Sequence, residues 1–184
     1  VILSDEVKLE CSEGDIYAAN TSYSFVAKYS PTNVLLWHQK IGGRNNQMIT
    51  GLVLSSKNEI YLCGTYTFEC IFSNIASTNN TIYKRRFDES IYYAKLQPEG
   101  SISFAKYFRS TGGNFCRSGS LAIDDNENVH MTGSYSGNLD FNSAASLQIG
   151  DILGDSYSIK SNWRVNTRGN SAWFYAIWKD DINI

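Results

Sequence analysis

Proline and histidine are both scarce in this chain, whose 184 residues include two of each. Long apolar runs are missing as well, since none approaches the roughly 20 residues that a membrane-spanning helix requires. Neither sign of charge dominates, because 16 Lys and Arg face 18 Asp and Glu, for a formal net charge of -2. This balance provides no long-range attraction to nucleic acid or to an anionic membrane, so we expect neither a nucleic-acid partner nor a membrane span.

The scarcity of histidine leaves little material for acid–base catalysis. His38 and His130 each lie in a strand pattern, and no Ser or Cys nucleophile stands near them in a motif such as GxSxG. We therefore interpret both as structural or surface residues. The sequence predicts no catalytic residue and no cofactor.

Metal-ligand patterns are also absent or incomplete. The four cysteines are Cys11, Cys63, Cys70 and Cys116. They form no CxxC pair, so a zinc site is not expected. Buried free thiols are the expected state, with a pairing of Cys63 and Cys70 across a loop as the alternative. The D-x-N-x-N spacing of a calcium loop occurs at Asp124, Asn126 and Asn128, but Val129 stands where that loop requires Gly. No metal site is predicted.

What the chain does contain is typical of an all-β protein. Aromatic residues make up 14% of it, with twelve Tyr, and 14 Gly accompany many Ser and Asn. Aromatic residues favour strands, and Gly, Ser and Asn favour tight turns. We expect many short strands and little helix.

The sequence repeats itself. "GLVLSSKNEIYLCGTYTFECIF" (51–72) aligns with "SLAIDDNENVHMTGSYSGNLDF" (120–141), 69 positions later, and "KLECSEGDIYAANT" (8–21) fits the same frame. Each copy reads as two short strands around a polar turn. The pattern predicts a β-hairpin in each copy.

A second hairpin follows the first in every copy. Its three versions are "FVAKYSPTNVLLW" (25–37), "YYAKLQPEGSISF" (92–104) and "WFYAIWKDDINI" (173–184). Pro in second place and Asn or Gly in fourth suit a tight turn in "SPTN" and "QPEG".

Alternate residues of a strand share a face, so each copy presents a row of large, small and large side chains. The rows are Phe25, Ala27, Tyr29; Tyr92, Ala94, Leu96; and Phe174, Ala176, Trp178. The strands that follow add Leu35 with Trp37, and Ile102 with Phe104, as further inward anchors.

Two hairpins make a four-stranded antiparallel sheet, and a repeated sheet buries its faces by stacking on its neighbours. We therefore predict an all-β fold of about three β-propeller blades, an incomplete propeller, with a β-sandwich as the rival architecture. The expected blade-like repeats are 1–43, 44–113 with an insertion at 73–90, and 114–184 with an insertion at 142–171 and its last strand missing.

The repeated phrases resemble a known family. "FVAKYSPTNVLLW" and "NENVHMTGSYSGNLDF" are similar to the bacterial-type seven-bladed β-propeller repeat called SBBP, across most of the chain outside the insertions. The resemblance implies a scaffold on secreted, surface or large-virus proteins, without a shared active site. This chain departs from the pattern at Asn20, where the other copies have Gly64 and Gly133, and it has too few blades. We expect a segment of a longer chain, with self-association of copies as the alternative.

The copies differ most in the two insertions, and a partner-binding face is one interpretation of them. Two basic groups with an aromatic residue lie in or beside them: Lys84, Arg85, Arg86, Lys160, Trp163, Arg164 and Arg168. These are the candidate partner-binding residues. The other interpretation is that the insertions are decoration, or strands that extend a blade.

These observations favour a non-catalytic structural or protein-interaction module in a larger surface, secreted or virion-associated assembly. Its expected partners are other protein chains, or further blades of the same chain. The alternative is a glycan-binding or hydrolytic propeller domain, since Tyr and Trp can stack on sugar rings.

Overall fold

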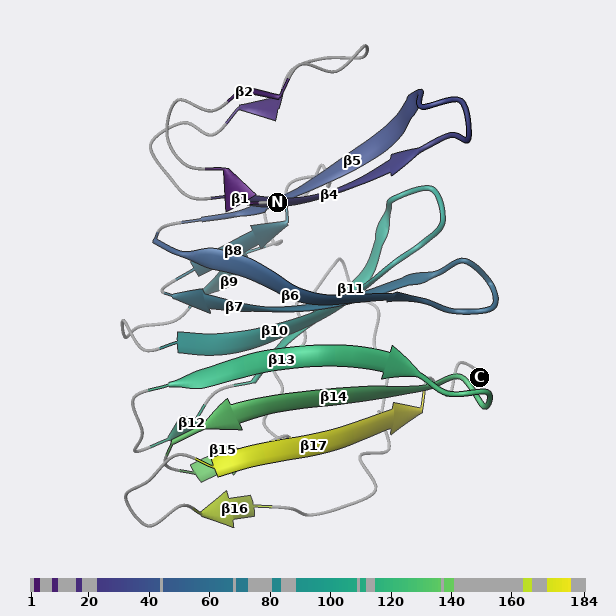
Figure 1. Cartoon of the computed structure of the whole chain (residues 1–184). Helices are drawn as coiled ribbons and strands as arrows, with labels where there is room; N and C mark the ends of the chain where they lie inside the picture. Colours follow the sequence, from purple (N-terminus) through teal and green to yellow (C-terminus); the bar gives the residue numbers. More distant parts are fainter. Residues whose placement is uncertain are drawn as a thin grey trace.

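Three stacked antiparallel sheets make up most of the computed structural model of the chain (Figure 1). The structure describes residues 2–3, 8–9, 16–17, 23–43, 45–67, 69–72, 81–83, 89–108, 110–111, 115–136, 138–140, 164–166 and 172–179. No helix occurs among them, so the predicted all-β fold is confirmed. The sheets stack in the manner of an incomplete propeller.

We number the three large sheets along the stack. The first sheet has the order β1 (Ile2–Leu3), β4 (Tyr23–Tyr29), β5 (Leu35–Gly42), β8 (Glu69–Phe72) and β9 (Thr81–Tyr83). The second sheet has the order β11 (Ile102–Phe108), β10 (Glu89–Leu96), β7 (Ile60–Thr67) and β6 (Gln47–Leu54). The third sheet has the order β13 (Cys116–Ile123), β14 (Asn128–Tyr135) and β17 (Ala172–Lys179).

Two small sheets complete the described chain. They are β2 (Lys8–Leu9) with β3 (Ile16–Tyr17), and β12 (Ser110–Thr111) with β15 (Asn138–Asp140) and β16 (Arg164–Asn166). The β2–β3 hairpin confirms the first predicted hairpin, but it forms a sheet of its own and does not join β4. Instead, β1 pairs with the start of β4. The first sheet is therefore not built from four successive strands, as the second is.

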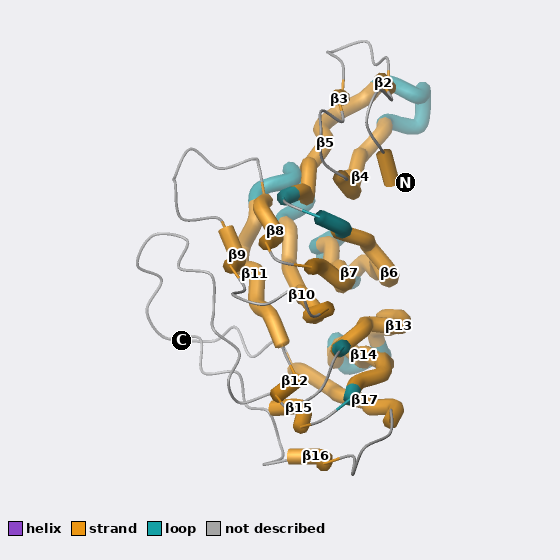
Figure 2. Tube along the Cα trace, turned by 90° about the vertical axis from the view of Figure 1, so that its left-hand side faces the viewer, coloured by secondary structure: helices purple, strands orange, loops and turns teal. Residues whose placement is uncertain are grey.

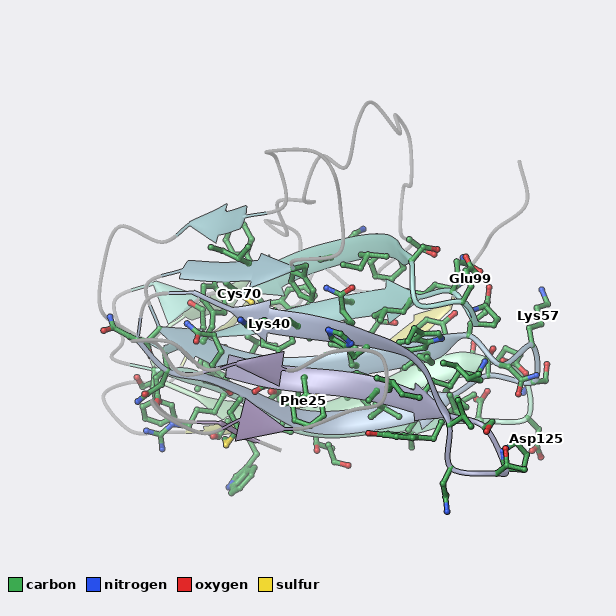
Figure 3. The ribbon with its side chains drawn as sticks, turned by 90° about the horizontal axis from the view of Figure 1, so that it is seen from above. Phe25, Lys40, Lys57, Cys70, Glu99 and Asp125 are labelled. Carbon is green, nitrogen blue, oxygen red and sulfur yellow. The ribbon has the colours of Figure 1, made fainter. Side chains whose placement is uncertain are left out.

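The hairpin turns share one geometry. Each turn has two backbone hydrogen bonds: the amide of its first residue donates to the carbonyl of its fifth, and the amide of its fourth donates to the carbonyl of its first. These turns are Ser30–Val34, Ser55–Glu59, Gln97–Ser101 and Asp124–Asn128. The fourth residue of each has a positive φ, namely Asn33, Asn58, Gly100 and Glu127. The predicted preference for Asn or Gly at this position is confirmed in "SPTN" and "QPEG". Figure 3, which looks down the stack, shows Lys57, Glu99 and Asp125, from three of these turns, on the same side of it.

Two hydrophobic cores lie between the sheets. We call the face of each sheet that looks toward the next sheet its forward face, and the opposite face its rear face. The row of Tyr92, Ala94 and Leu96 on the rear face of the second sheet is fully buried with Val26 and residues of β8. The second core joins the forward face of the second sheet to the rear face of the third, where it includes Phe174, and Ala176 packs against it. These two predicted rows therefore pack between sheets.

The anchors in the last strand of each hairpin do not share one face. A β-bulge between Lys95 and Leu96 turns Ile102 toward the first sheet and Phe104 toward the third. Trp37 lies on the forward face of the first sheet, where its indole Nε1 donates to the carbonyl of Pro98 at 3.0 Å. Ile102 and Trp37 thus pack between the first and second sheets, and Phe104 packs between the second and third.

The cysteines agree with the predicted state where they are described. Cys63, Cys70 and Cys116 are buried and free, and Cys11 lies outside the described residues. Burial raises the pKa of the Cys63 thiol, and raises that of Cys70 well above its ordinary value. Both thiols are therefore protonated and unreactive at neutral pH.

Short strands next to the predicted insertions tie each sheet to the one before it. β8 follows β7 of the second sheet, yet it pairs with β5 of the first, with Ile41 opposite Phe72. β15 follows β14 of the third sheet and pairs with β12, which follows the last strand of the second, with Ser110 opposite Leu139. The two pairings have the same register, because the β5–β8 pairs fall in line with the β12–β15 pairs when each residue is moved along the chain to its equivalent in the next copy. In Figure 2, β8, β9, β12 and β15 lie on the side away from β6 and β13.

This arrangement supports one of the two interpretations of the insertions. Within the insertions, β9 pairs with β8 in the first sheet and β16 pairs with β15 in the small sheet, so each extends a sheet as an ordinary ladder strand does. Cys70 and Phe72 of β8 are fully buried, and the Phe72 ring meets that of Tyr92 edge to face at 5.7 Å. These segments act as structural braces between sheets.

Candidate functional site

The forward face of the third sheet is the candidate site, and its position in the repeat is defined by two glycines. In the second sheet Gly64 pairs with Tyr92. In the third sheet Gly133 pairs with Phe174. A Cβ built on either glycine would lie 2.2 or 2.4 Å from the partner ring, so the ring rests directly on the backbone. The two sheets therefore have the same register, and their residues can be compared position by position.

Equivalent residues differ completely in burial. Ile91, Tyr93 and Lys95 on the forward face of the second sheet are 0%, 2% and 1% exposed, because the third sheet covers them. Their equivalents are Trp173, Tyr175 and Ile177, which are 82%, 61% and 47% exposed. The open surface of the third sheet thus has the place in the repeat that forms a core one sheet earlier. We call the surface made by Trp173, Tyr175, Ile177, His130 and Thr132 the open forward face.

A hydrogen-bonded row crosses this face beside an open cavity of about 410 Å³. Nε2 of His130 lies 3.2 Å from Oδ2 of Asp124, and Nδ1 contacts the hydroxyl of Tyr175. A carboxylate can only accept, so in the neutral ring Nε2 carries the hydrogen and Nδ1 accepts from the phenol. The row orients Tyr175 across the sheet.

Asp124 also closes its own turn. Its Oδ1 accepts from the amides of Asn126 and Asn128 at 2.9 and 2.8 Å, and its Oδ2 accepts from the Asn128 side chain at 2.7 Å. These bonds, with that of Asn128 largest, hold the pKa of Asp124 well below its ordinary value. The D-x-N-x-N spacing therefore has a local explanation, in which the carboxylate satisfies turn amides.

The aromatic pair at the centre of the open forward face has a packing counterpart. Tyr61 and Tyr93 occupy the same positions in the second sheet as His130 and Tyr175 in the third, and their rings stack with centroids 6.2 Å apart. The His130 and Tyr175 rings are 5.7 Å apart. The pair is thus a modified version of a core contact. It does not assemble a nucleophile, base and oxyanion donors.

The rear face of the first sheet, at the opposite end of the stack, is only partly exposed, since Leu35 beside Tyr29 is 3% exposed and β2 and β3 lie above β4 and β5 (Figures 1 and 2). Phe25, Ala27 and Tyr29 lie on the rear face of the first sheet, at the positions of Tyr92, Ala94 and Leu96. Tyr29 is 51% exposed. Figure 3 looks down on this surface, with Phe25 and Lys40 labelled. Of the residues on this face, Phe25, Ala27, His38 and Lys40 are partly buried, so it is less exposed than the open forward face.

Most of the predicted partner-binding residues lie outside the described part of the chain. These are Lys84, Arg85, Arg86, Lys160, Trp163 and Arg168. Arg164 begins β16 and pairs with Asp140 in the ladder. The prediction that these seven residues bind a partner stays a prediction.

Sequence reasoning missed the residues that form the open forward face. It followed the row of Phe174, Ala176 and Trp178, and left aside the alternate residues Trp173, Tyr175 and Ile177. The alternation places these residues in one row on the other face, because alternate residues of a strand share a face, but it does not show that this face is exposed.

Comparisons with known proteins add no assignment. We found no matching protein-family model and no matching curated protein. The resemblance to the SBBP repeat therefore stays a prediction. Within the described residues, no helix has the length and apolar character needed to cross a membrane.

Proposed function

We propose that this chain is a non-catalytic structural or protein-interaction module, a segment of a longer stack of β-blades within a larger assembly. One observation carries the proposal. The open forward face is equivalent in register to a face that is almost fully buried one sheet earlier. A surface with that place in the repeat is suited to be covered by another sheet.

The chemistry of the open forward face supports a packing role. Ile177 is half exposed where the second sheet has a buried Lys95. Trp173 is the most exposed large hydrophobic residue in the described chain. Large exposed aromatic residues on a flat sheet are typical of protein interfaces. The resemblance to the SBBP repeat is the ground for placing the assembly on a cell surface, in a secreted complex or in a virion.

Footprinting of Trp173 tests this proposal. Oxidative labelling of the isolated chain should modify Trp173 and Tyr175 rapidly, whereas both should be protected in the native assembly that contains the chain. Tyr93, which is buried in either state, serves as the internal control. Equal labelling of Trp173 in the isolated chain and in the assembly would overturn the proposal.

A glycan-binding role is the second candidate. The Tyr175 ring lines the open cavity with Asp124 and His130, and the exposed Trp173 ring lies on the same face, so this surface offers stacking and hydrogen bonding to a sugar. This role predicts that a glycan array gives specific binding that Trp173→Ala abolishes. Turnover of such a glycan by the isolated monomer would favour the hydrolytic form of this alternative over the structural module.

A further inference from the structure

Lysine occupies one forward-face position in the first and second sheets but not in the third. In the first sheet it is Lys28, whose Nζ donates to the carbonyl of Pro98 in the second sheet at 2.8 Å. In the second sheet it is Lys95, which is buried. The equivalent residue of the third sheet is Ile177, which holds the same place in its ladder. The open forward face therefore lacks the ammonium group that each of the two covered forward faces has.

The surroundings of Lys95 show how this ammonium group is held on a covered face. Its Nζ lies 3.1 Å from Oε1 of Glu59 and 5.2 Å from the centroid of the Tyr61 ring. The Tyr61 ring stacks in turn on that of Tyr93. One carboxylate and one aromatic pair thus provide the partners that a buried cation needs.

The open forward face has an aromatic pair and a carboxylate but no such cation. His130 and Tyr175 replace the two tyrosines, and the carboxylate is that of Asp124. The hydrogen bonds of Asp124 come from two backbone amides, the side chain of Asn128 and the neutral His130 ring, so its charge is not neutralised. The lowered pKa of Asp124 keeps it ionised at neutral pH. None of the ion pairs within the described residues brings a Lys or Arg to it.

The open cavity provides room for a cationic side chain beside this row. It is lined by Ser120 and Thr132 as well as by the hydrogen-bonded row itself. The equivalent of Ser120 in the second sheet is Gly51, where an added Cβ would lie 2.8 Å from the backbone nitrogen of Leu121 in the third sheet. The Ser120 side chain therefore prevents a cover from approaching as closely here as the third sheet approaches the second. Space for a side chain remains under such a cover.

From this comparison we propose that the cavity binds a lysine or arginine side chain of the protein that covers the open forward face. The inference rests on the proposed function and names the chemistry of the partner. The cation would lie against the rings of His130 and Tyr175, as Lys95 lies over the ring of Tyr61. Exposed Asp125 adds a second negative charge at the same turn. A basic patch on the partner is thus complementary to this acidic and aromatic surface.

Titration of the isolated chain with small cations tests the inference. The probes are the methylamides of Nα-acetyl-lysine and Nα-acetyl-arginine, and the uncharged norleucine analogue is the control. In NMR spectra of the isotope-labelled chain, a cationic probe should shift the amide signals of His130 and Tyr175 to saturation, whereas the norleucine compound should not. Asp124→Asn removes the negative charge, and should weaken binding of the probe by about 10-fold or more.

A second substitution supplies the missing cation from within the chain. Ile177→Lys restores the lysine of the other two sheets, and should prevent the added probe from binding. Asn46→Lys adds the same charge at an exposed site outside this face, and should leave binding unchanged. Well-dispersed amide spectra of all variants would show that they are folded.

Two results would overturn the inference. One is the absence of saturable shifts with both cationic probes, and the other is binding that Asp124→Asn and Ile177→Lys leave intact. If Trp173 is nevertheless protected in the native assembly, the proposed function stands and only the cationic side chain is excluded. Saturable binding of a probe together with unprotected Trp173 would contradict the proposed function instead.

Discussion

The forward faces of the second and third sheets are the same surface in two situations. Tyr93 and Tyr175 occupy equivalent positions on identical registers, yet one is buried and the other is mostly exposed. Lys95 is buried, with its Nζ 3.1 Å from Oε1 of Glu59, whereas its equivalent Ile177 is half exposed. A buried lysine in one sheet and an exposed isoleucine at the equivalent position of the next reverse the usual burial preference of these residues. Burial here is thus decided by the place of a sheet in the stack.

The same comparison applies to the polar groups. The second sheet is fastened to the third by Thr50 Oγ1 and Ser118 Oγ, 2.7 Å apart, and by the amide of Ser56, which donates to Oε1 of Glu127 at 3.0 Å. On the open forward face, His130 and Tyr175 bond to each other within one sheet. Polar groups on the covered faces thus form hydrogen bonds between sheets, whereas those on the open forward face form hydrogen bonds within their own sheet.

The largest predicted difference is between the two equivalent tyrosines. Tyr93→Ala should lower the free energy of unfolding by about 3–5 kcal/mol, because it empties a packed aromatic site. Tyr175→Ala should cost less than about 1 kcal/mol, because most of that side chain already meets solvent. Urea unfolding at concentrations where the chain is monomeric measures both. Equal losses would mean that the open forward face is covered within a single chain.

A second substitution tests the register that makes the comparison possible. Gly64→Ala should cost about 1–3 kcal/mol or more, because the new methyl would lie 2.2 Å from the Tyr92 ring and from the backbone oxygen of Met48. Gly119→Ala is the matched control, since its nearest neighbour is the Thr132 hydroxyl at 3.0 Å, at the end of a side chain. We expect less than about 1 kcal/mol there. Equal urea midpoints for the two variants would contradict the ring-on-glycine contact.

Much of this fold could be predicted from the residues. The copies 69 positions apart and the alternation around Ala94 and Ala176 predict stacked antiparallel sheets, because strand periodicity is a local property. Asn33 and Gly100 mark two of the turns, since few residues tolerate positive φ. Glu127 adopts the same conformation without being Asn or Gly, in a turn that Asp124 closes with two amide bonds.

The braces and the site could not be predicted in this way. The pairing of β8 with β5 joins segments that no local pattern relates, and it depends on how neighbouring sheets are stacked. The open forward face was missed because Trp173 and Tyr175 have the same chemistry as buried residues. Only the position of the third sheet at the end of the described stack distinguishes them.

A smaller effect should come from the hydroxyl that joins the second and third sheets. Ser118→Ala removes a buried partner of Thr50, and should cost about 1 kcal/mol, the net value of a typical hydrogen bond. Ser134→Ala makes the same chemical change on the open forward face, and should stay within about 0.5 kcal/mol of the parent chain. Thermal or urea unfolding of the pair measures the difference. A larger loss for Ser134 than for Ser118 would contradict the assignment of covered and open faces.

The smallest predicted effect is a difference in how stability depends on pH between two equivalent turns. The turn that begins at Ser55 is closed by a hydroxyl, and the turn that begins at Asp124 is closed by a carboxylate. Because the pKa of Asp124 is lowered in the folded state, its contribution to stability is present above the ordinary Asp pKa and is lost as the pH falls toward the folded value. The urea midpoint of the parent chain should therefore fall more steeply below about pH 4 than that of Asp124→Asn. Ser55→Ala should lower the midpoint with a weaker dependence on pH, because a neutral hydroxyl closes that turn and its one charged contact, to Oε2 of Glu59, is long at 3.4 Å. Parallel pH profiles for the parent and Asp124→Asn would show that the turn does not depend on the charge of Asp124.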